Sequence, residues 1–206
     1  MLAYSIPLRI LREHRPNWCK PKRRSPFWLM LPPVTGWPEL LSMLIAAGDG
    51  FSGWASLNDT VMGGRSSGEC LVNSDGLLMQ AEVVAEGGGF VSCRSPVWQP
   101  PLDLSSATSL RLRLQGDGRR YKLAVAVSDL AGRLGDLVPG GLRWVEDFDT
   151  QDSGISEIVI PFSALQPVVR AKPVGFPLRF EPTKVSRLQI LHSRFGDDGQ
   201  SNPGFR

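Results

Sequence analysis

The chain has 206 residues, of which 42% are hydrophobic and 21% charged, with 22 glycines and 17 prolines. These values exclude a wholly disordered, a collagen-like and a disulfide-stapled chain. They suit one globular domain with an appendage, or two very small domains. The formal net charge is +3, but residues 1–24 hold seven basic residues against Glu13 alone. The remainder is acidic, so the basic balance does not indicate a nucleic-acid-binding body.

Residues 1–47 form a basic, Pro- and Trp-rich extension. A basic run at 20–24 precedes an apolar stretch that four prolines interrupt between residues 26 and 48. A transmembrane helix needs about 20 continuous apolar residues, so we reject a membrane span. Only Glu39–Ala47 has a helical period. We expect 1–47 to be poorly ordered, with a targeting segment and a membrane-surface contact as alternatives.

Residues 48–206 form a second unit with the pattern of a β-domain. Short apolar runs separated by Gly, Pro and Asp predict strands at Leu77–Ala85, Phe90–Arg94, Ile155–Ile160 and Leu188–His192. Gly87 to Gly89 predict a hairpin or bulge between the first two of these strands. Many short strands of this kind predict an all-β sandwich.

The segment Ser109–Val127 predicts a β-hairpin. Leucines alternate with arginines before Asp117-Gly118, and apolar residues alternate again after it. If Asp117-Gly118 forms a type I′ turn, Leu110 faces Val125 on one apolar side. The opposite, solvated side then gathers four cations into one candidate partner-binding patch: Arg111, Arg113, Arg120 and Lys122.

The three cysteines show no CxxC spacing. A disulfide framework is therefore not expected, and a reducing compartment is the better interpretation. We expect Cys70 and Cys93 to be buried as small apolar side chains, with a disulfide between them as the alternative.

The sequence offers no candidate catalytic or metal-ligating group. His192 is the one histidine of residues 48–206, and its neighbour Ser193 points to the opposite face of a strand, so neither a metal cluster nor a triad is expected. The acidic residues between 146 and 152 lack the glycine of a calcium loop, so we expect a solvated acidic loop. We assign no catalytic residue, no metal and no cofactor.

The most distinctive stretch is Trp54–Gly68, WASLNDTVMGGRSSG. Asn58-Asp59 predicts a side-chain-capped turn, and Gly63-Gly64 permits positive φ or close backbone approach. Val61 is expected to be an apolar anchor of the turn, as are Trp54 and Met62. A turn that only locks a strand is the alternative to a binding site. The candidate partner-binding residues here are Trp54, Asn58, Asp59, Met62, Gly63 and Gly64.

Five motifs in order carry a family resemblance. W-x3-N-D-x-V-M-G-G-x-S-x-G is followed by G-G-F-x-S-x-R from Gly88, D-L-S from Asp103, G-D-G-R-x-Y from Gly116 and I-P-F-S from Ile160. In this order the chain resembles the complex I intermediate-associated protein family over residues 50–205. The resemblance implies a galactose-binding-like jelly-roll β-sandwich. The family's sandwich usually runs on into a further strand where this chain stops, so we expect an open edge or groove.

The resemblance also implies a function. It implies a non-enzymatic assembly factor, or chaperone, that binds subunits of a membrane-bound NADH dehydrogenase or a related photosynthetic complex. The expected location is the cytoplasm, with a peripheral membrane contact as an extension of this, or the mitochondrial matrix in a eukaryote. One alternative is a carbohydrate-binding module with a stacking platform at Trp54, Trp98 or Trp144. Another is an RNA- or photosystem-associated biogenesis factor, although the basic patch lacks aromatic residues for base stacking, so nucleic acid is not expected.

Overall fold

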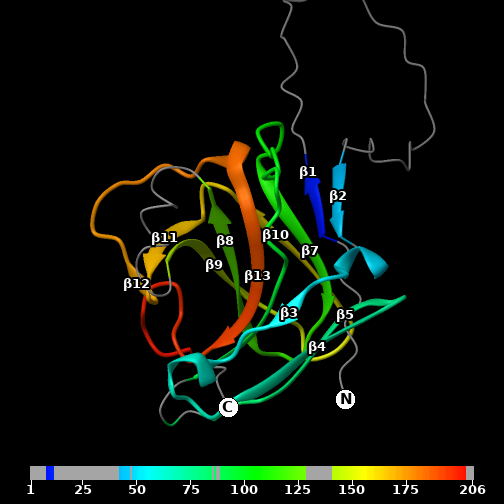
Figure 1. The fold of residues 1–206 in the computed structure, drawn as a ribbon, viewed down its shortest axis with the longest axis vertical. Helices are drawn as coiled ribbons and strands as arrows, with labels where there is room; N and C mark the ends of the chain where they lie inside the picture. Colours follow the sequence, from blue (N-terminus) through cyan, green and yellow to red (C-terminus); the bar gives the residue numbers. More distant parts are fainter. Residues whose placement is uncertain are drawn as a thin grey trace, which may run out of the picture.

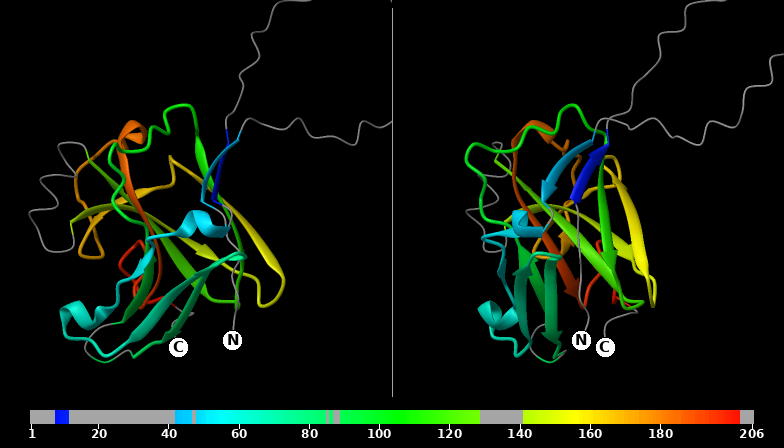
Figure 2. Two further views of the ribbon diagram at one scale, coloured as in Figure 1. Left: turned by 45° about the vertical axis from the view of Figure 1, so that its right-hand side comes forward. Right: turned by 90° about the vertical axis from the view of Figure 1, so that its right-hand side faces the viewer.

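Two antiparallel sheets face each other across an apolar core, and a two-stranded ribbon lies at one end of them (Figures 1 and 2). The structure is a computed structural model that describes residues 8–11, 42–46, 48–84, 86, 89–128 and 141–202. In this part of the chain the regular elements are strands and three short 3-10 helices. The predicted all-β sandwich is confirmed.

The four-stranded sheet has the order β10-β7-β1-β2. It contains β1 (Leu8–Leu11), β2 (Ser42–Ala46), β7 (Ser109–Gln115) and β10 (Ile155–Pro161). The seven-stranded sheet has the order β12-β11-β9-β8-β13-β6-β3. It contains β3 (Ala55–Ser56), β6 (Phe90–Arg94), β8 (Arg120–Val127), β9 (Leu142–Asp149), β11 (Gln166–Val169), β12 (Lys172–Pro173) and β13 (Val185–Ser193).

The remaining elements complete the sandwich at its ends. The ribbon pairs β4 with β5, and the 3-10 helices η1 and η2 flank β3 in the sequence, while η3 leads into β13. Their bounds are β4 (Ser67–Asn73), β5 (Gly76–Glu82), η1 (Gly48–Phe51), η2 (Asp59–Met62) and η3 (Pro182–Lys184).

The core forms where the apolar faces of the two sheets meet. Leu110 and Leu112 of β7 and Leu123 and Val125 of β8 are all 0% exposed. Burying each such side chain contributes about 1.5–3 kcal/mol to the free energy of unfolding. The alternating pattern therefore places one stripe of each strand in the core and the other stripe on an outer face.

The predicted hairpin at Ser109–Val127 is wrong. Strand β7 pairs with β10 and β1, whereas β8 pairs with β9 and β13. Leu110 therefore lies opposite Ile160 in one sheet, and Val125 lies opposite Trp144 in the other. Alternating apolar residues are buried equally well beside each other in one sheet or facing each other across a core, so periodicity alone could not distinguish the two arrangements.

The chain instead crosses between the sheets after β7, and it crosses again after β9. The two crossing loops lie side by side, because the Thr150 backbone N–H and hydroxyl donate to the Arg119 carbonyl at 3.1 and 2.8 Å. The Gly118 N–H donates to the Gln151 carbonyl at 3.0 Å. The G-D-G-R-x-Y motif thus marks a sheet-to-sheet crossing.

Two short strands of the expected extension belong to the four-stranded sheet. Strand β1 lies between β7 and β2, with Leu8 opposite Leu112 and Leu11 opposite Ser109. Residues 42–46 form a strand, where the sequence showed a helical period, because pairing satisfies backbone groups regardless of side-chain period. The rest of the expected extension up to residue 41 lies outside the described residues, as do residues 203–206.

Cys70 of β4 and Cys93 of β6 form a disulfide, with their Cα atoms 5.7 Å apart. The expectation of two separate apolar thiols is therefore wrong, and the alternative that the sequence left open holds. The residues are 23 positions apart, so their pairing depends on how the ribbon lies over β6. The bond ties the ribbon to the seven-stranded sheet.

Candidate partner-binding site

The loop after β3 presents an exposed apolar pair on η2. Met62 is 68% exposed and Val61 is 65% exposed, which makes them the two most exposed large apolar side chains of the described residues. We call Thr60–Gly63 the η2 tip. Exposed apolar side chains that lie together on a surface are a mark of protein–protein contact sites.

A buried carboxylate holds the η2 tip in place. Asp59 is 0% exposed, and its side chain accepts hydrogen bonds from the Ser66 N–H at 2.9 Å, the Ser66 hydroxyl at 2.7 Å and the Gly89 N–H at 2.6 Å. A buried carboxylate needs donors of this kind, because desolvation without them is costly. Asp59 therefore joins η2 to the start of β4 and to the residue before β6.

The two glycines of the motif have separate roles. Gly63 has φ of 87°, in the left-handed region that favours glycine. Gly64 lies against the Asp59 carboxylate, so a Cβ on Gly64 would stand 2.3 Å from Asp59 Cγ. Nearby, the Asn58 side-chain amide donates to the Gly68 carbonyl at 2.9 Å. The motif thus builds a rigid frame with an apolar end.

The structure divides the six predicted residues of this loop into frame and tip. Trp54 is 7% exposed and packs edge-on against Phe51, with ring centroids 5.2 Å apart. Asp59 is likewise inside the frame. Met62 and Gly63 reach solvent, and so does Val61, so neither Val61 nor Met62 is the buried apolar anchor that the sequence suggested. A single 3-10 turn that starts at a buried Asp and stops at Gly63 leaves its other side chains outside.

The predicted single basic patch is wrong. Arg111 and Arg113 lie on the outer face of the four-stranded sheet, where Glu157 is opposite Arg113 and 3.8 Å away. Arg120 and Lys122 lie on the outer face of the seven-stranded sheet. Because β7 and β8 belong to different sheets, the two pairs of cations face away from each other.

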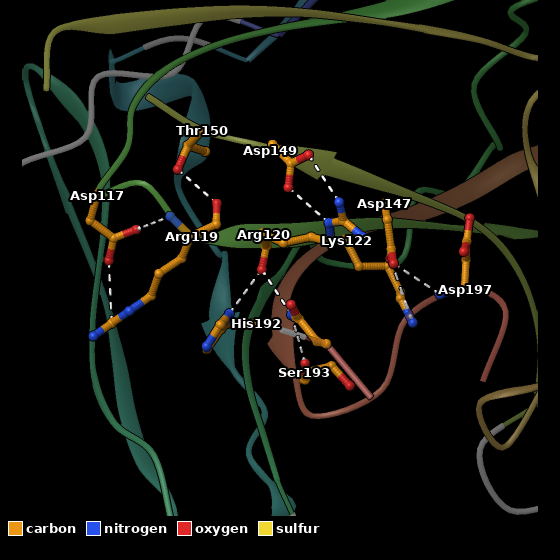
Figure 3. A network of polar contacts seen from close by, with 11 residues as sticks. Asp117, Arg119, Arg120, Lys122, Asp147, Asp149, Thr150, His192, Ser193 and Asp197 are labelled. Carbon is orange, nitrogen blue, oxygen red and sulfur yellow. Dashed lines mark hydrogen bonds and ion pairs between the residues drawn. The ribbon is translucent and has the colours of Figure 1, made fainter. Parts of the chain in front are cut away.

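Arg120 and Lys122 are committed to contacts within the protein (Figure 3). The Arg120 guanidinium donates to both oxygens of Asp149, at 2.8 and 3.1 Å, and this pairing lowers the pKa of Asp149. Lys122 is 5% exposed and donates to the Phe195 carbonyl at 2.9 Å. Burial lowers the pKa of Lys122, against the opposing effect of the nearby Asp147 carboxylate.

These contacts hold residues 194–202 against β8 and β9. Asp147 accepts a hydrogen bond from the Asp197 N–H at 3.0 Å, and burial raises the pKa of Asp147. The Asn202 side-chain amide donates to the Ser193 and Arg120 carbonyls, at 3.0 and 3.2 Å. Lys122 therefore stabilises the fold from a buried position, whereas the sequence pattern predicted that it would be exposed for partner binding.

The acidic residues and the tryptophans that the sequence offered as alternative sites also belong to the framework of the fold. Glu146, Asp147 and Asp149 belong to β9 and not to a solvated loop. Trp144 is 3% exposed, so neither it nor Trp54 offers a stacking platform for a sugar. Within the described residues, no group of three or more His, Cys, Asp or Glu side chains could hold a metal ion, and no helix is long and apolar enough to cross a membrane.

The two facing antiparallel sheets define the chain as a galactose-binding-like β-sandwich. The family 11 carbohydrate-binding module from Clostridium thermocellum, in complex with a β-1,3-1,4-mixed-linked tetrasaccharide, is similar with a TM-score of 0.50 and 16% identity, covering 73% of this chain and 83% of that chain. The same module of the cellulosomal cellulase Lic26A-Cel5E gives a TM-score of 0.49, 16% identity and coverage of 73% and 81%. At this identity the likeness concerns the fold alone.

The family model of complex I intermediate-associated protein 30 (CIA30) matches residues 43–204, and the chain belongs to this family. The resemblance found in the sequence motifs is thereby confirmed. The match begins within β2, at its second residue, and β1 precedes it. The family suggests a role in complex I assembly and is not known as a family of enzymes. Among curated proteins, none matches this chain.

Proposed function

We propose that this protein is a non-enzymatic assembly factor that binds partly built NADH dehydrogenase-type membrane complexes. The observation that carries the proposal is membership of the CIA30 family over residues 43–204. The protein would cover an exposed surface of a subcomplex and leave when the next subunit docks. Its place of action would then be the membrane periphery, on the side where these subunits assemble.

We assign the docking contact to the η2 tip. Val61 and Met62 project from a frame that Asp59 fixes through three hydrogen bonds. A contact that is rigid before binding loses little conformational entropy on association. Exposed apolar anchors of this kind dominate small interfaces, and a small interface suits a partner that must leave again.

The test is affinity purification of the tagged full chain from its own cells in mild detergent, with mass spectrometry of the co-purified proteins. Wild type is expected to recover NADH dehydrogenase subunits, and Val61→Asp/Met62→Asp to recover at least fivefold less. Phe176→Asp is the matched control, because Phe176 is 63% exposed and follows β12, at the opposite edge of the seven-stranded sheet from β3. Circular dichroism checks that all variants fold.

Each other outcome has a definite meaning. Recovery of photosystem subunits or ribosomes would replace the client, and equal recovery by the tip variant would remove the η2 tip as the docking contact. Arg111→Glu/Arg113→Glu in the same experiment tests the outer face of the four-stranded sheet as a second contact. Reduced recovery by this variant supports that contact, and unchanged recovery excludes it.

Carbohydrate binding is the second candidate, and the similarity of the fold to a carbohydrate-binding module motivates it. Titration of the purified chain with a mixed-linked β-glucan tetrasaccharide, followed by tryptophan fluorescence, tests it. We expect no saturable quenching, because Trp54 and Trp144 are buried and the partly buried Trp98 packs against the core. Saturable quenching would favour this candidate over the assembly role.

A further inference from the structure

The β4–β5 ribbon is the least supported sheet of the described structure. Its two strands pair with each other from Ser67–Glu82 to Asn73–Gly76, and within the described residues neither strand pairs with another sheet. An isolated two-stranded hairpin is marginally stable in water. The ribbon lies beside the two large sheets (Figure 2), and its stability therefore depends on its contacts with them.

Polar contacts, a disulfide and the packing of Leu77 and Met79 on the core hold the ribbon. At its base, the Ser66 hydroxyl contacts Asp59 and accepts a hydrogen bond from the Val84 N–H at 3.0 Å. Midway along β4, the disulfide joins Cys70 to Cys93 of the seven-stranded sheet. The base is fixed by a polar network, whereas the middle is held by apolar packing and by one covalent bond that a reductant can break.

The ribbon covers apolar core residues along a seam that contains a small cavity. A cavity of about 20 Å³ separates Leu77 and Met79 of the ribbon from residues of both large sheets. This is room for about one water, and the cavity offers it no polar partner, so facing groups there lack close contacts. The other lining residues are Cys93, Leu114, Tyr121, Phe148 and Ile190.

We propose that the Cys70–Cys93 disulfide is a redox latch on the ribbon, and that its reduction by a dithiol exposes the apolar seam to solvent. Cys93 is 1% exposed, whereas Cys70 is half-buried. Cys70 is therefore the more exposed cysteine of the pair. This accessibility decides which end of the bond the reductant attacks.

The exchange is a two-electron reduction. A thiolate of the dithiol attacks Cys70 Sγ, the Cys70–Cys93 bond breaks, and Cys93 leaves as a thiolate that takes up a proton. The second thiol of the reductant then attacks the mixed disulfide at the reductant's own sulfur. This step releases the Cys70 thiol and leaves the reductant as a disulfide.

The Asp59 network then becomes the pivot of the ribbon. Its hydrogen bonds to Ser66 and Gly89 do not involve either cysteine, so the η2 tip keeps its place while the ribbon moves. Leu114, Tyr121 and Phe148 become accessible beneath it. The latch does not depend on the proposed function.

The test uses the full chain with Cys19→Ser, so that Cys70 and Cys93 are the only cysteines. Alkylation with a maleimide counts free thiols before and after dithiothreitol, and hydrogen exchange is followed in both states. We expect residues 67–82 to exchange at least tenfold faster after reduction, with β13 unchanged. Fluorescence of the apolar dye bis-ANS is expected to rise severalfold, and re-oxidation should reverse both changes.

Cys70→Ser and Cys93→Ser in the same background are the matched controls. Each should behave like the reduced protein and ignore dithiothreitol. Two free thiols in the air-oxidised protein would overturn the latch, as would equal exchange of the ribbon in both redox states. Faster exchange of β13 on reduction would also overturn it, because the disulfide would then support the whole fold. No partner is present in these measurements, so their result is independent of the assembly role.

Discussion

A single buried carboxylate explains most of the Trp54–Gly68 motif. Asp59 needs its three donors, Gly64 must leave room for the carboxylate, and Gly63 must adopt a left-handed conformation. Val61 and Met62 are the part of the motif that the frame does not use. A motif that identifies the family can therefore be mostly structural and still place a functional pair of side chains.

Gly64→Ala tests this frame. A Cβ at residue 64 would overlap the Asp59 side chain, which is fully buried and cannot move without losing its hydrogen bonds. We expect the free energy of unfolding to fall by about 2 kcal/mol or more in urea titrations. Gly175→Ala is the control, because a Cβ there meets nothing within 4 Å, and it should change stability by less than about 0.5 kcal/mol. Equal stability of the two variants would contradict the frame.

His192 gives stability a dependence on pH. It is 2% exposed and packs against Tyr121, and burial lowers the pKa of His192 below its ordinary value of 6.5. Below pH 6.5 the unfolded chain takes up a proton that the folded protein resists, so the free energy of unfolding falls as the pH decreases. Urea titrations at pH 7.5 and 5.5 should show a smaller fall for His192→Gln than for wild type. An identical fall would exclude His192 as the cause.

At the scale of elements, the paired crossing loops decide how the two sheets connect. A Cβ on Gly116 would lie 2.1 Å from the Thr150 Cβ. Gly116→Ala is therefore expected to cost about 2 kcal/mol or more, and Thr150→Gly about 1 kcal/mol through its lost hydrogen bond. Because the two residues touch, the double variant should be more stable than the sum of the single effects predicts. Additive effects, measured by urea titration, would contradict the side-by-side loops.

At the scale of the whole molecule, the sandwich separates cations that are close in sequence. Arg113 faces Glu157 on one outer face, and Arg120 holds Asp149 on the other. Arg120→Glu should destabilise the fold more than Arg113→Glu, because Arg120 makes the two-pronged contact. The double variant should be additive within about 0.5 kcal/mol, since the sites share no partner. A coupling above about 1 kcal/mol would indicate one shared patch.

The sequence by itself determined the all-β class, the family and the residues that alternate between core and surface. These follow from local periodicity, turn residues and motif order, which are properties of neighbouring positions in the chain. It did not determine which sheet each strand joins, so it placed β7 and β8 in one hairpin and four cations in one patch. The leucines are buried both in a single hairpin and in two strands that face each other across the core.

Only the tertiary structure decided the contacts between distant segments. The Cys70–Cys93 bond, the burial of Lys122 under residues 194–202 and the three donors to Asp59 each join positions that local pattern treats independently. The sequence predicted Val61 and Met62 to be buried apolar anchors because apolar residues are usually buried. Their exposure follows from the direction in which the Asp59 frame points η2, and that direction is set by the packing of β4 and β6 around it.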